Sequence, residues 1–148
     1  MEIVQSNNTE LNEIVKTNYP IFKDICGKEP YSLSQYNARI KEKKPVFFVA
    51  KENHKLIGNT IAFEDNNSFY IWIIGVSKNK RNKGIGSKLL ELNENYARKN
   101  GFESVTTKVY NFSTEMKKLL KKRGYTITRI DNAHNELYSA NHYCLIFK

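Results

Sequence analysis

The chain has 148 residues, of which 40% are hydrophobic and 12% aromatic, so it fits one globular domain and is not a disordered chain. Its formal net charge of +9 suits an anionic cofactor, nucleic acid, or a lysine-rich surface that serves solubility. No apolar run approaches the ~20 residues of a membrane helix, and the N-terminus lacks the pattern of a signal peptide. We therefore expect a soluble, cytoplasmic protein.

The two cysteines, Cys26 and Cys144, lie far apart in the sequence and belong to no closely spaced Cys/His set. This spacing argues against a disulfide scaffold and against a zinc site. We expect no bound metal.

The N-terminal part of the chain predicts a short strand at Ile3 and Val4 and then two helices. The first helix has apolar residues at helical spacing and should end near Pro20, because proline disfavours helix in the residue before it. Ser32 and Gln35 have the spacing of a capping box, which predicts the start of the second helix.

Three strands joined by tight turns should follow, at residues 46–50, 56–63 and 69–76. The polar triplets between them predict an antiparallel meander. The third strand is apolar at nearly every position, which indicates burial on both faces. Gly75 lies near its end and marks either a plain strand end or a close approach of another backbone or a ligand.

The loop after this strand, residues 77–87, is basic and contains Gly84 and Gly86, and it leads into a helix that stops at Asn100 and Gly101. A strand that feeds a glycine-containing turn at the start of a helix presents unpaired backbone N–H groups and the positive end of the helix dipole. Such a point binds phosphate well. The alternative is a solvated basic loop whose glycines only form a turn. The basic residues are Lys78, Lys80, Arg81 and Lys83.

Residues 105–110 predict a strand that pairs in parallel with the strand ending at Val76, because a β-helix-β passage favours that arrangement. A helix capped by Ser113 or Thr114 should follow and stop at Gly124. Residues 125–130 and 143–147 predict the last two strands.

The stretch Arg81-Asn82-Lys83-Gly84-Ile85-Gly86 resembles the R/Q-x-x-G-x-G/A motif of the GNAT superfamily of N-acetyltransferases, and Val76 stands where that family has its strand-end valine. The resemblance extends in weaker form from about Pro45 to Tyr125. It implies one GNAT domain over residues 1–148. The implied fold is α+β, with a mixed, mostly antiparallel sheet of about six to seven strands, helices on both faces and a splayed parallel strand pair.

In that family the loop holds the pyrophosphate of acetyl-coenzyme A, and the backbone at the strand end pairs with the pantetheine arm. The resemblance therefore implies acetyl-CoA or coenzyme A (CoA) as co-substrate, without a metal. It places Ile74, Gly75 and Val76 on pantetheine, and Arg81, Asn82, Lys83, Gly84, Ile85, Gly86 and Ser87 on pyrophosphate, with Asn111 and Ser113 as further cofactor contacts.

The family's usual proton donor is a tyrosine in the pattern N-x-x-A-x-x-L-Y-x-x-x-G-F. When the pattern is aligned on Gly124, Leu120 stands in the place of that tyrosine and Ser113 in the place of the asparagine. Leucine cannot donate a proton, so Tyr110 or a water is the expected general acid. Leu120 should then belong to the apolar wall of the acetyl and pantetheine channel.

Glu64, which follows the strand ending at Phe63, is the candidate general base, although turn carboxylates of this kind are mostly solvated. His134 and His142 flank the last hairpin, where the family often builds its acceptor pocket, and either can equally be a surface residue. The two N-terminal helices form another part of that wall in the family. Their candidate pocket residues, for which core packing is the alternative, are Tyr19, Phe22, Tyr31 and Tyr36.

These features predict an acyltransferase, namely an acetyl-CoA-dependent N-acetyltransferase that acts on a primary amine of a small molecule or peptide. The alternative is a non-catalytic CoA-binding or regulatory module of the same fold, which Leu120 favours. A nucleic-acid-binding protein is less favoured, because the lysines are spread along the chain and most aromatics fall in apolar strands. We expect acetyl-CoA and an amine acceptor as partners, no membrane, no specific nucleic acid, and a monomer or homodimer.

Overall fold

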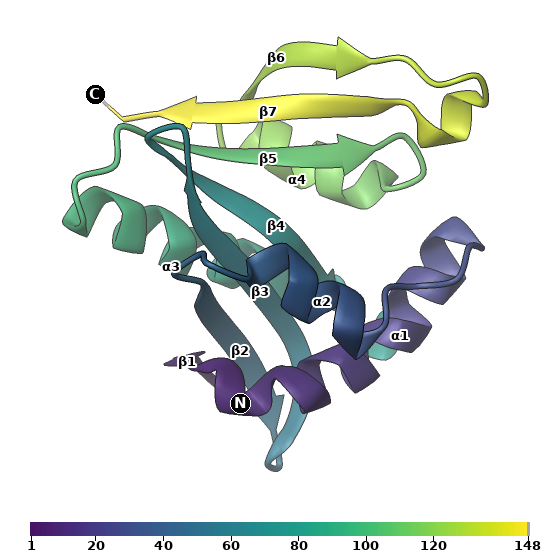
Figure 1. The fold of residues 1–148 in the computed structure, drawn as a ribbon, viewed down its shortest axis with the longest axis vertical. Coiled ribbons are helices and arrows are strands. Elements are labelled where there is room, and N and C mark those ends of the chain that lie inside the picture. The colour runs from purple at the N-terminus through teal and green to yellow at the C-terminus, as the bar shows by residue number, and fades with distance from the viewer. Residues whose placement is uncertain (148) are drawn as a thin grey trace.

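The computed structural model describes residues 1–147, apart from the side chain of Asn8. The helices and strands follow the predicted order (Figure 1). They are β1 (Glu2–Ser6), α1 (Leu11–Cys26), α2 (Leu33–Ile40), β2 (Val46–Glu52), β3 (Lys55–Asp65), β4 (Ser68–Val76), α3 (Ile85–Lys99), β5 (Ser104–Tyr110), α4 (Thr114–Lys122), β6 (Thr126–Asp131) and β7 (Ala140–Ile146), with short 3₁₀ turns η1 (Asn8–Glu10), η2 (Lys78–Lys80) and η3 (Glu136–Tyr138). No helix in the described part of the chain is long and apolar enough to cross a bilayer.

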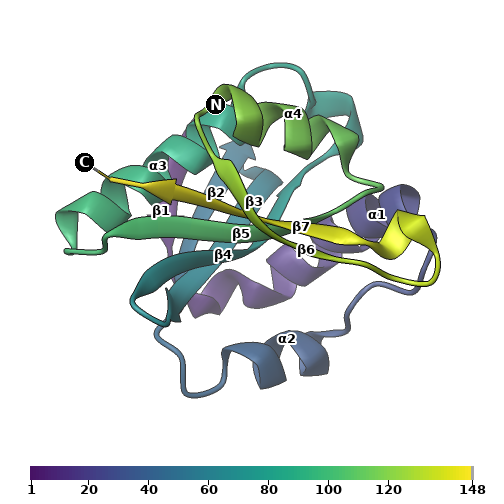
Figure 2. The same ribbon diagram turned by 90° about the horizontal axis from the view of Figure 1, so that it is seen from above.

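The strands form one seven-stranded sheet in the order β1-β2-β3-β4-β5-β7-β6. β4 and β5 pair in parallel, and the other neighbouring strands pair antiparallel. Helices α1 and α2 lie on one face of the sheet, and α3 and α4 lie on the other (Figure 2). The mixed α+β fold with one parallel pair is therefore confirmed.

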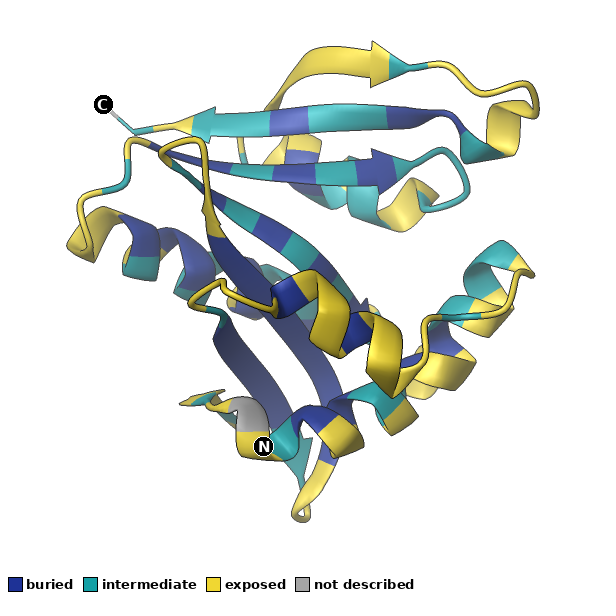
Figure 3. Ribbon diagram, viewed as in Figure 1, coloured by how far each residue is buried: buried dark blue, intermediate teal, exposed yellow. Residues whose placement is uncertain are grey.

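Each face of the sheet has its own apolar core. Phe69, Leu89 and Leu120 belong to the core beneath α3 and α4, and Ile14 and Phe47 belong to the core beneath α1 and α2. Both faces of β2 and β3 are covered, whereas β6 is exposed at the sheet edge (Figure 3). The best-packed part of the sheet thus lies next to β4.

Several local predictions are confirmed. Ser32 and Gln35 form the predicted capping box of α2, with reciprocal hydrogen bonds of 3.2 and 2.8 Å. The turns around Asn53 and Asn66 have the positive φ angles, 53° and 49°, of tight hairpin turns. Strand β7, in contrast, begins at Ala140, earlier than predicted, because polar residues before Tyr143 also pair with β5 and β6.

Helix α1 is longer than the sequence predicts. Pro20 lies inside it, although a proline within a helix removes one backbone hydrogen bond and costs ~3 kcal/mol. The helix continues because its buried stripe continues to Ile21, against β3 and β4. It ends at Cys26, where Gly27 takes a φ of 70° and its N–H bonds to the Lys23 carbonyl at 3.0 Å. The prediction that this helix ends near Pro20 was therefore wrong.

Strand β4 contains a β-bulge. Opposite β3, the register steps from the pair Ile61–Ile73 to the pair Ala62–Ile71, so that Trp72 is an extra residue in β4. A bulge of this kind reverses which side chains point to which face of the sheet.

Buried and half-buried residues alternate along β4. The prediction that the strand is buried on both faces was therefore wrong, and the bulge explains which residues remain half-buried. Before the bulge, Tyr70 and Trp72 are half-buried on the face of α1 and α2. After it, Ile74 and Val76 are half-buried on the face of α3 and α4. β4 therefore presents incompletely covered side chains to both faces at neighbouring positions.

Candidate active site

Strands β4 and β5 pair only at the start of β4, through Phe69–Val105, Tyr70–Thr106 and Ile71–Thr107. The Thr107 hydroxyl donates a hydrogen bond of 2.8 Å to the carbonyl of Ile71 at the end of this pairing. Beyond that point the two strands diverge (Figure 1). Within the described residues, the edge of β4 that faces β5 then has no strand partner as far as Val76. Apart from the Val76 carbonyl, which accepts from Arg81 Nε (3.0 Å), its backbone polar groups are available for other hydrogen bonds.

The loop between β4 and α3 presents further unpaired N–H groups. Asn82 and Gly84 have positive φ angles of 63° and 81°. The first hydrogen bond of α3 runs from the N–H of Lys88 to the carbonyl of Gly84, and no side chain caps the helix. The N–H groups of residues 85–87 are therefore unpaired within the described chain. A left-handed residue followed by free helical N–H groups forms a concavity that can bind an anion.

The basic side chains of this loop are less free than the sequence indicates. Lys83 forms no ion pair among residues 1–147, but three others have partners: Arg81 with the carbonyl of Val76 (3.0 Å), Lys80 with Glu52 (2.6 Å) and Lys78 with Asp24 (3.7 Å). Arg81 thus ties the loop to the end of β4. Its Nη2 atom is buried and lacks an acceptor within the described residues.

Gly75 is a point of close approach, and the neighbour is helix α1. A Cβ atom at this position would lie 3.2 Å from Asn18 Oδ1 and 3.4 Å from Phe22 Cζ. The first distance is tighter than nearly all contacts of a real Cβ atom and the second is at the short end of ordinary contact, so a larger residue would push Asn18 and α1 away from β4.

Asn18 belongs to a buried polar network under the end of β4. Its amide donates to the hydroxyl of Tyr36 (3.1 Å) and to Asn59 Oδ1 (3.1 Å), and Asn59 donates back to Asn18 Oδ1 (2.7 Å). The network joins α1, α2 and β3 on the face of the sheet on which Trp72 lies.

Replacing Tyr36 with phenylalanine is expected to lower the free energy of unfolding by about 1–3 kcal/mol, because a buried N–H of Asn18 loses its acceptor. Burial raises the pKa of Tyr36 to about 12. The stability that Tyr36 contributes should therefore be complete below the unfolded pKa of about 10 and decrease as the pH rises towards about 12. Urea unfolding of both proteins at about pH 8 and about pH 11 measures this, and an equal stability at the lower pH would contradict it.

A second polar cluster holds the end of α4 against α3. The buried Glu94 carboxylate accepts hydrogen bonds from Arg123 Nε (3.0 Å) and Nη2 (2.5 Å) and from the Tyr125 hydroxyl (2.9 Å). Arg123 Nη1 also donates to the hydroxyl of Ser87 at 3.0 Å. The hydrogen bond with Glu94 raises the pKa of Arg123, and burial raises the pKa of Tyr125. This cluster fixes the first turn of α3, where the unpaired N–H groups lie.

The sequence model of the acetyltransferase (GNAT) family matches residues 9–125 of this chain, a range that contains the loop, the diverging strands and both polar clusters. The chain belongs to the GNAT family. One curated relative, an L-2,4-diaminobutyric acid acetyltransferase of Halalkalibacterium halodurans, is 46% identical over 46 residues. That match covers 29% of this chain and only 24% of the relative.

Solved structures share the GNAT fold over nearly the whole chain. The ribosomal-protein-S18-alanine N-acetyltransferase of Escherichia coli superposes with a TM-score of 0.80 at 18% identity, covering 98% of this chain and 92% of that chain. A chain of the NatC complex, bound to Gag peptide and CoA, has a TM-score of 0.75 at 19% identity and covers 100% of both chains. At these identities the likeness establishes the fold.

The position of the usual GNAT tyrosine is fully buried here. Leu120 has 0% exposure and lies in the core beneath α4, so it does not line an open channel as predicted. Leu119 and Met116, its neighbours on α4, are half-buried. A Cβ atom on Gly86 would lie 3.4 Å from Leu119 Cδ2 and 4.0 Å from Val76 Cγ2, so Leu119 is the α4 residue that faces the start of α3.

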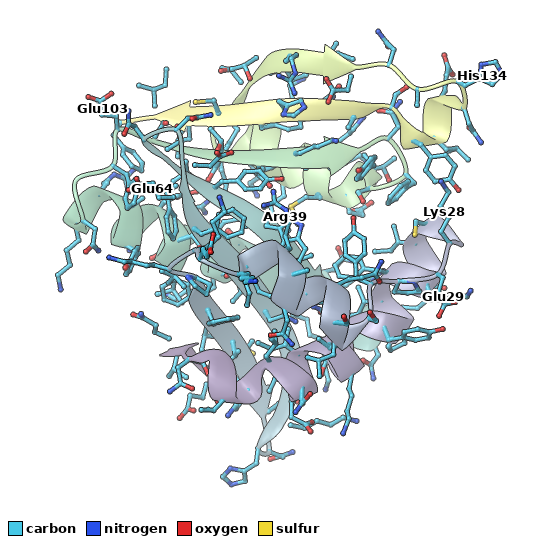
Figure 4. All side chains as sticks on the ribbon, in the orientation of Figure 1. Lys28, Glu29, Arg39, Glu64, Glu103 and His134 are labelled. Carbon is cyan, nitrogen blue, oxygen red and sulfur yellow. The ribbon has the colours of Figure 1, made fainter. Side chains whose placement is uncertain are left out.

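The structure separates the two candidate catalytic residues of this GNAT chain. Tyr110 is half-buried at the end of β5, where its ring stacks on Phe112 with centroids 5.3 Å apart. Its hydroxyl has no hydrogen-bond partner among residues 1–147. Glu64 is exposed and pairs with Phe69 at the start of β4, away from the loop at the other end of that strand (Figure 4).

The two further candidate cofactor residues follow β5. The side chain of Asn111 already donates to the carbonyl of Glu136 (2.8 Å) and accepts from Lys117. Ser113 precedes α4 without capping it, and its hydroxyl has no partner within the described chain. Of the two, Ser113 has the freer side chain.

Two of the four candidate pocket residues gather around Trp72, on the face of α1 and α2. Tyr31 stacks on the Trp72 ring with centroids 6.0 Å apart, and Tyr36 lies 5.2 Å from it. Phe22 packs beside Gly75 instead, and Tyr19 is exposed and donates to Glu29 (2.7 Å). On this face Trp72 is a candidate site residue that the sequence interpretation missed.

The last hairpin, formed by β6 and β7, also contacts helix α1. Tyr138 donates to the carbonyl of Cys26 at 3.3 Å, so the hairpin touches the end of α1. His142 lies 2.7 Å from Asp131, and this hydrogen bond holds the pKa of Asp131 below its usual value. His134 is exposed near the tip of the hairpin (Figure 4).

Proposed function

We propose that this chain is an acetyl-CoA-dependent N-acetyltransferase that acetylates a primary amine of a small molecule or peptide. The observation that carries the proposal is the meeting of two features at one end of β4. The strand has an unpaired backbone edge there, and it leads directly into a loop with unpaired N–H groups at a helix start.

The residues at this junction fit CoA. The N–H groups of Ile85, Gly86 and Ser87, with the left-handed Asn82 and Gly84 before them, suit the pyrophosphate. The free β4 edge at residues 74–76 suits the amides of pantetheine, which need backbone partners. The related NatC chain is bound to CoA, and we extend that ligand to this chain. Acetyl-CoA would supply the acetyl group as a thioester.

The acceptor would approach from the other face, where Tyr70 and Trp72 are half-buried. Its amine forms the new N–C bond as the C–S bond breaks, and the proton lost by nitrogen balances the departing thiolate. An amine with a pKa of about 10.4 is almost wholly protonated at neutral pH, so a group or water must first take its proton. We assign Tyr110 as the candidate that exchanges a proton here, because its hydroxyl has no hydrogen-bond partner in the described part of the chain.

A second candidate function is a non-catalytic CoA-binding module of the same fold. Leu120 favours it, because the position of the usual proton donor holds a buried leucine. A thiol-release assay with acetyl-CoA and a panel of amines distinguishes the two functions, and L-2,4-diaminobutyric acid is the first acceptor to try because the curated relative is named for it. CoA binding without thiol release on any amine would favour the binding module.

Tyr110→Phe is expected to lower kcat by at most ~10²-fold, because a thiol with a pKa near 8.5 leaves largely without an acid. Glu64→Gln should leave kcat unchanged, because Glu64 is exposed and lies at the far end of β4. Steady-state kinetics at saturating acetyl-CoA measures both variants. A large loss of kcat in Glu64→Gln, with none in Tyr110→Phe, would show that Glu64 and not Tyr110 takes part in catalysis.

A further inference from the structure

Arg39 lies on the last turn of α2 (Figure 4), and its guanidinium lies against a platform of three neighbouring aromatic side chains. The guanidinium carbon lies 5.0 Å from the ring centroid of Phe63, 5.7 Å from Trp72 and 6.0 Å from Tyr70. Phe63 is buried, and the other two rings are half-buried. Cation–π contacts of this kind attract the guanidinium to the rings without using its N–H donors.

Those donors are unused within the described chain. Arg39 forms no ion pair and no hydrogen bond among residues 1–147. The other arginines all have acceptors: Arg81 the carbonyl of Val76, Arg98 the side chain of Asn95, Arg123 the carboxylate of Glu94 and Arg129 that of Asp131. Arg39 is therefore an exposed cation that lies against aromatic rings and has no hydrogen-bond acceptor among residues 1–147.

The position of Arg39 links it to the acceptor side of the site. Trp72, one of its rings, is the bulge residue just beyond the last β4–β5 pair. Burial is the main cause that raises the pKa of Tyr70, and Arg39 opposes that rise while Tyr110 adds to it. Tyr70 pairs with Thr106 of β5, and Tyr110, four residues further along β5, points to the same face as Thr106 because side chains alternate along a strand. Arg39 thus lies on the same face as the candidate proton-exchanging residue.

Lys43 brings a second positive charge to the platform. Lys43 Nζ lies 5.4 Å from the centroid of the Phe63 ring, on which Arg39 also lies. Asp65 is the nearby carboxylate that adds to the pKa rise of Tyr70, but it forms no ion pair with Arg39 within the described residues. An acceptor that carried only positive charge would be repelled here, whereas a carboxylate would find the planar fork to which it binds in two hydrogen bonds.

We propose that Arg39 binds a carboxylate of the acceptor, so that the preferred substrate carries a carboxylate as well as the amine that is acetylated. This inference rests on the proposed transferase function and specifies its substrate class. A free amino acid with a side-chain amine and a peptide with an acidic residue both supply this chemistry.

Binding can be tested without turnover, because Trp72 is the single tryptophan of the chain and belongs to the platform. Its fluorescence is followed while the CoA-saturated protein is titrated with L-lysine and with cadaverine, the same diamine without the carboxylate. We expect L-lysine to bind at least about 10-fold more tightly, the usual range for a charge-assisted hydrogen-bonded pair. Equal Kd values for the two would overturn the inference.

The variants separate Arg39 from general electrostatics. Arg39→Met keeps an unbranched apolar stem over the rings, and it should remove the preference for L-lysine while leaving the Kd of cadaverine unchanged or lower. Arg39→Lys keeps the charge but not the fork, so it should retain part of the preference. Lys41→Met, which removes an exposed charge at the end of α2, is the matched control and should change neither Kd. An equal loss in Lys41→Met would overturn the inference.

A pair of C-terminally amidated peptides, alike except for one aspartate or asparagine, tests the second source of the carboxylate. If only the aspartate peptide binds in an Arg39-dependent way, the carboxylate contact stands and the acceptor is a peptide. Arg39-dependent binding without thiol release from acetyl-CoA would refute the transferase function and leave the contact intact. Thiol release that is indifferent to the carboxylate would refute the contact and leave the function intact.

Discussion

Gly86→Val is expected to weaken CoA binding by about 100-fold, equivalent to about 2.7 kcal/mol, while the protein remains folded. A Cβ atom at this position points towards Leu119 and Val76, at 3.4 and 4.0 Å. The two further methyl groups of valine would fill the space between the start of α3, the end of β4 and α4. Valine there would also crowd the approach of the anion to the unpaired N–H groups of residues 85–87. Isothermal calorimetry with CoA measures the loss.

Two variants control this experiment. Gly86→Ala adds only a methyl group at an ordinary contact distance, so its CoA affinity should remain within about 3-fold of the wild type, or less than 1 kcal/mol. Asn95→Val puts the same β-branched residue on the exposed side of α3 and should leave the affinity unchanged. A folded Gly86→Val protein with wild-type affinity would show that CoA does not bind next to Gly86.

Glu94→Gln should lower the free energy of unfolding by about 2–4 kcal/mol, because it leaves the guanidinium of Arg123 without its carboxylate. The side chains of Glu94 and Arg123 are only 5% and 21% exposed, so water can solvate the unpaired guanidinium only poorly. Because Arg123 also donates to Ser87, the first turn of α3 should loosen and CoA affinity should fall as well. Urea unfolding and calorimetry report the two effects separately.

Glu91→Gln is the matched control on the same helix. Glu91 pairs with Lys88 at 3.4 Å, but both side chains are about half exposed, so this change should cost less than about 1 kcal/mol. The double variant Glu94→Gln, Arg123→Met should recover part of the lost stability, because it removes the unpaired charge. If the double variant were as unstable as the sum of the two single variants, coupling between Glu94 and Arg123 would be excluded.

Local sequence signals determined most of the fold. The capping box at Ser32, the turn residues around Asn53 and Asn66, and the stop at Gly124 act through their own backbone, so their effect can be read from adjacent residues. The motif from Arg81 to Gly86 is also local, because it describes one loop and the helix start that follows it. These signals were enough for the element order and the family.

What only the tertiary structure decided depends on contacts between distant residues. Pro20 stays helical because Ile21 is buried beyond it, and Gly75 is required because α1 packs against β4. The bulge at Trp72 depends on pairing with β3, and no residue in β4 alone reveals it. Burial is a property of the assembled layers, so an apolar strand cannot by itself indicate which of its residues remain uncovered.

The charged residues of the site show the same division. The sequence indicates that Arg81 is basic, but only the structure shows that it bonds to the Val76 carbonyl. Glu94 lies between the buried Leu90 and Ala97 at helical spacing, a signal of burial that the sequence interpretation missed, but its partner Arg123 is recognisable only when α4 lies against α3. Composition thus determines which charges the chain carries. The folded arrangement determines which of them are neutralised and which, like Arg39, form no ion pair among residues 1–147, because a charge is paired only when distant segments bring an acceptor to it.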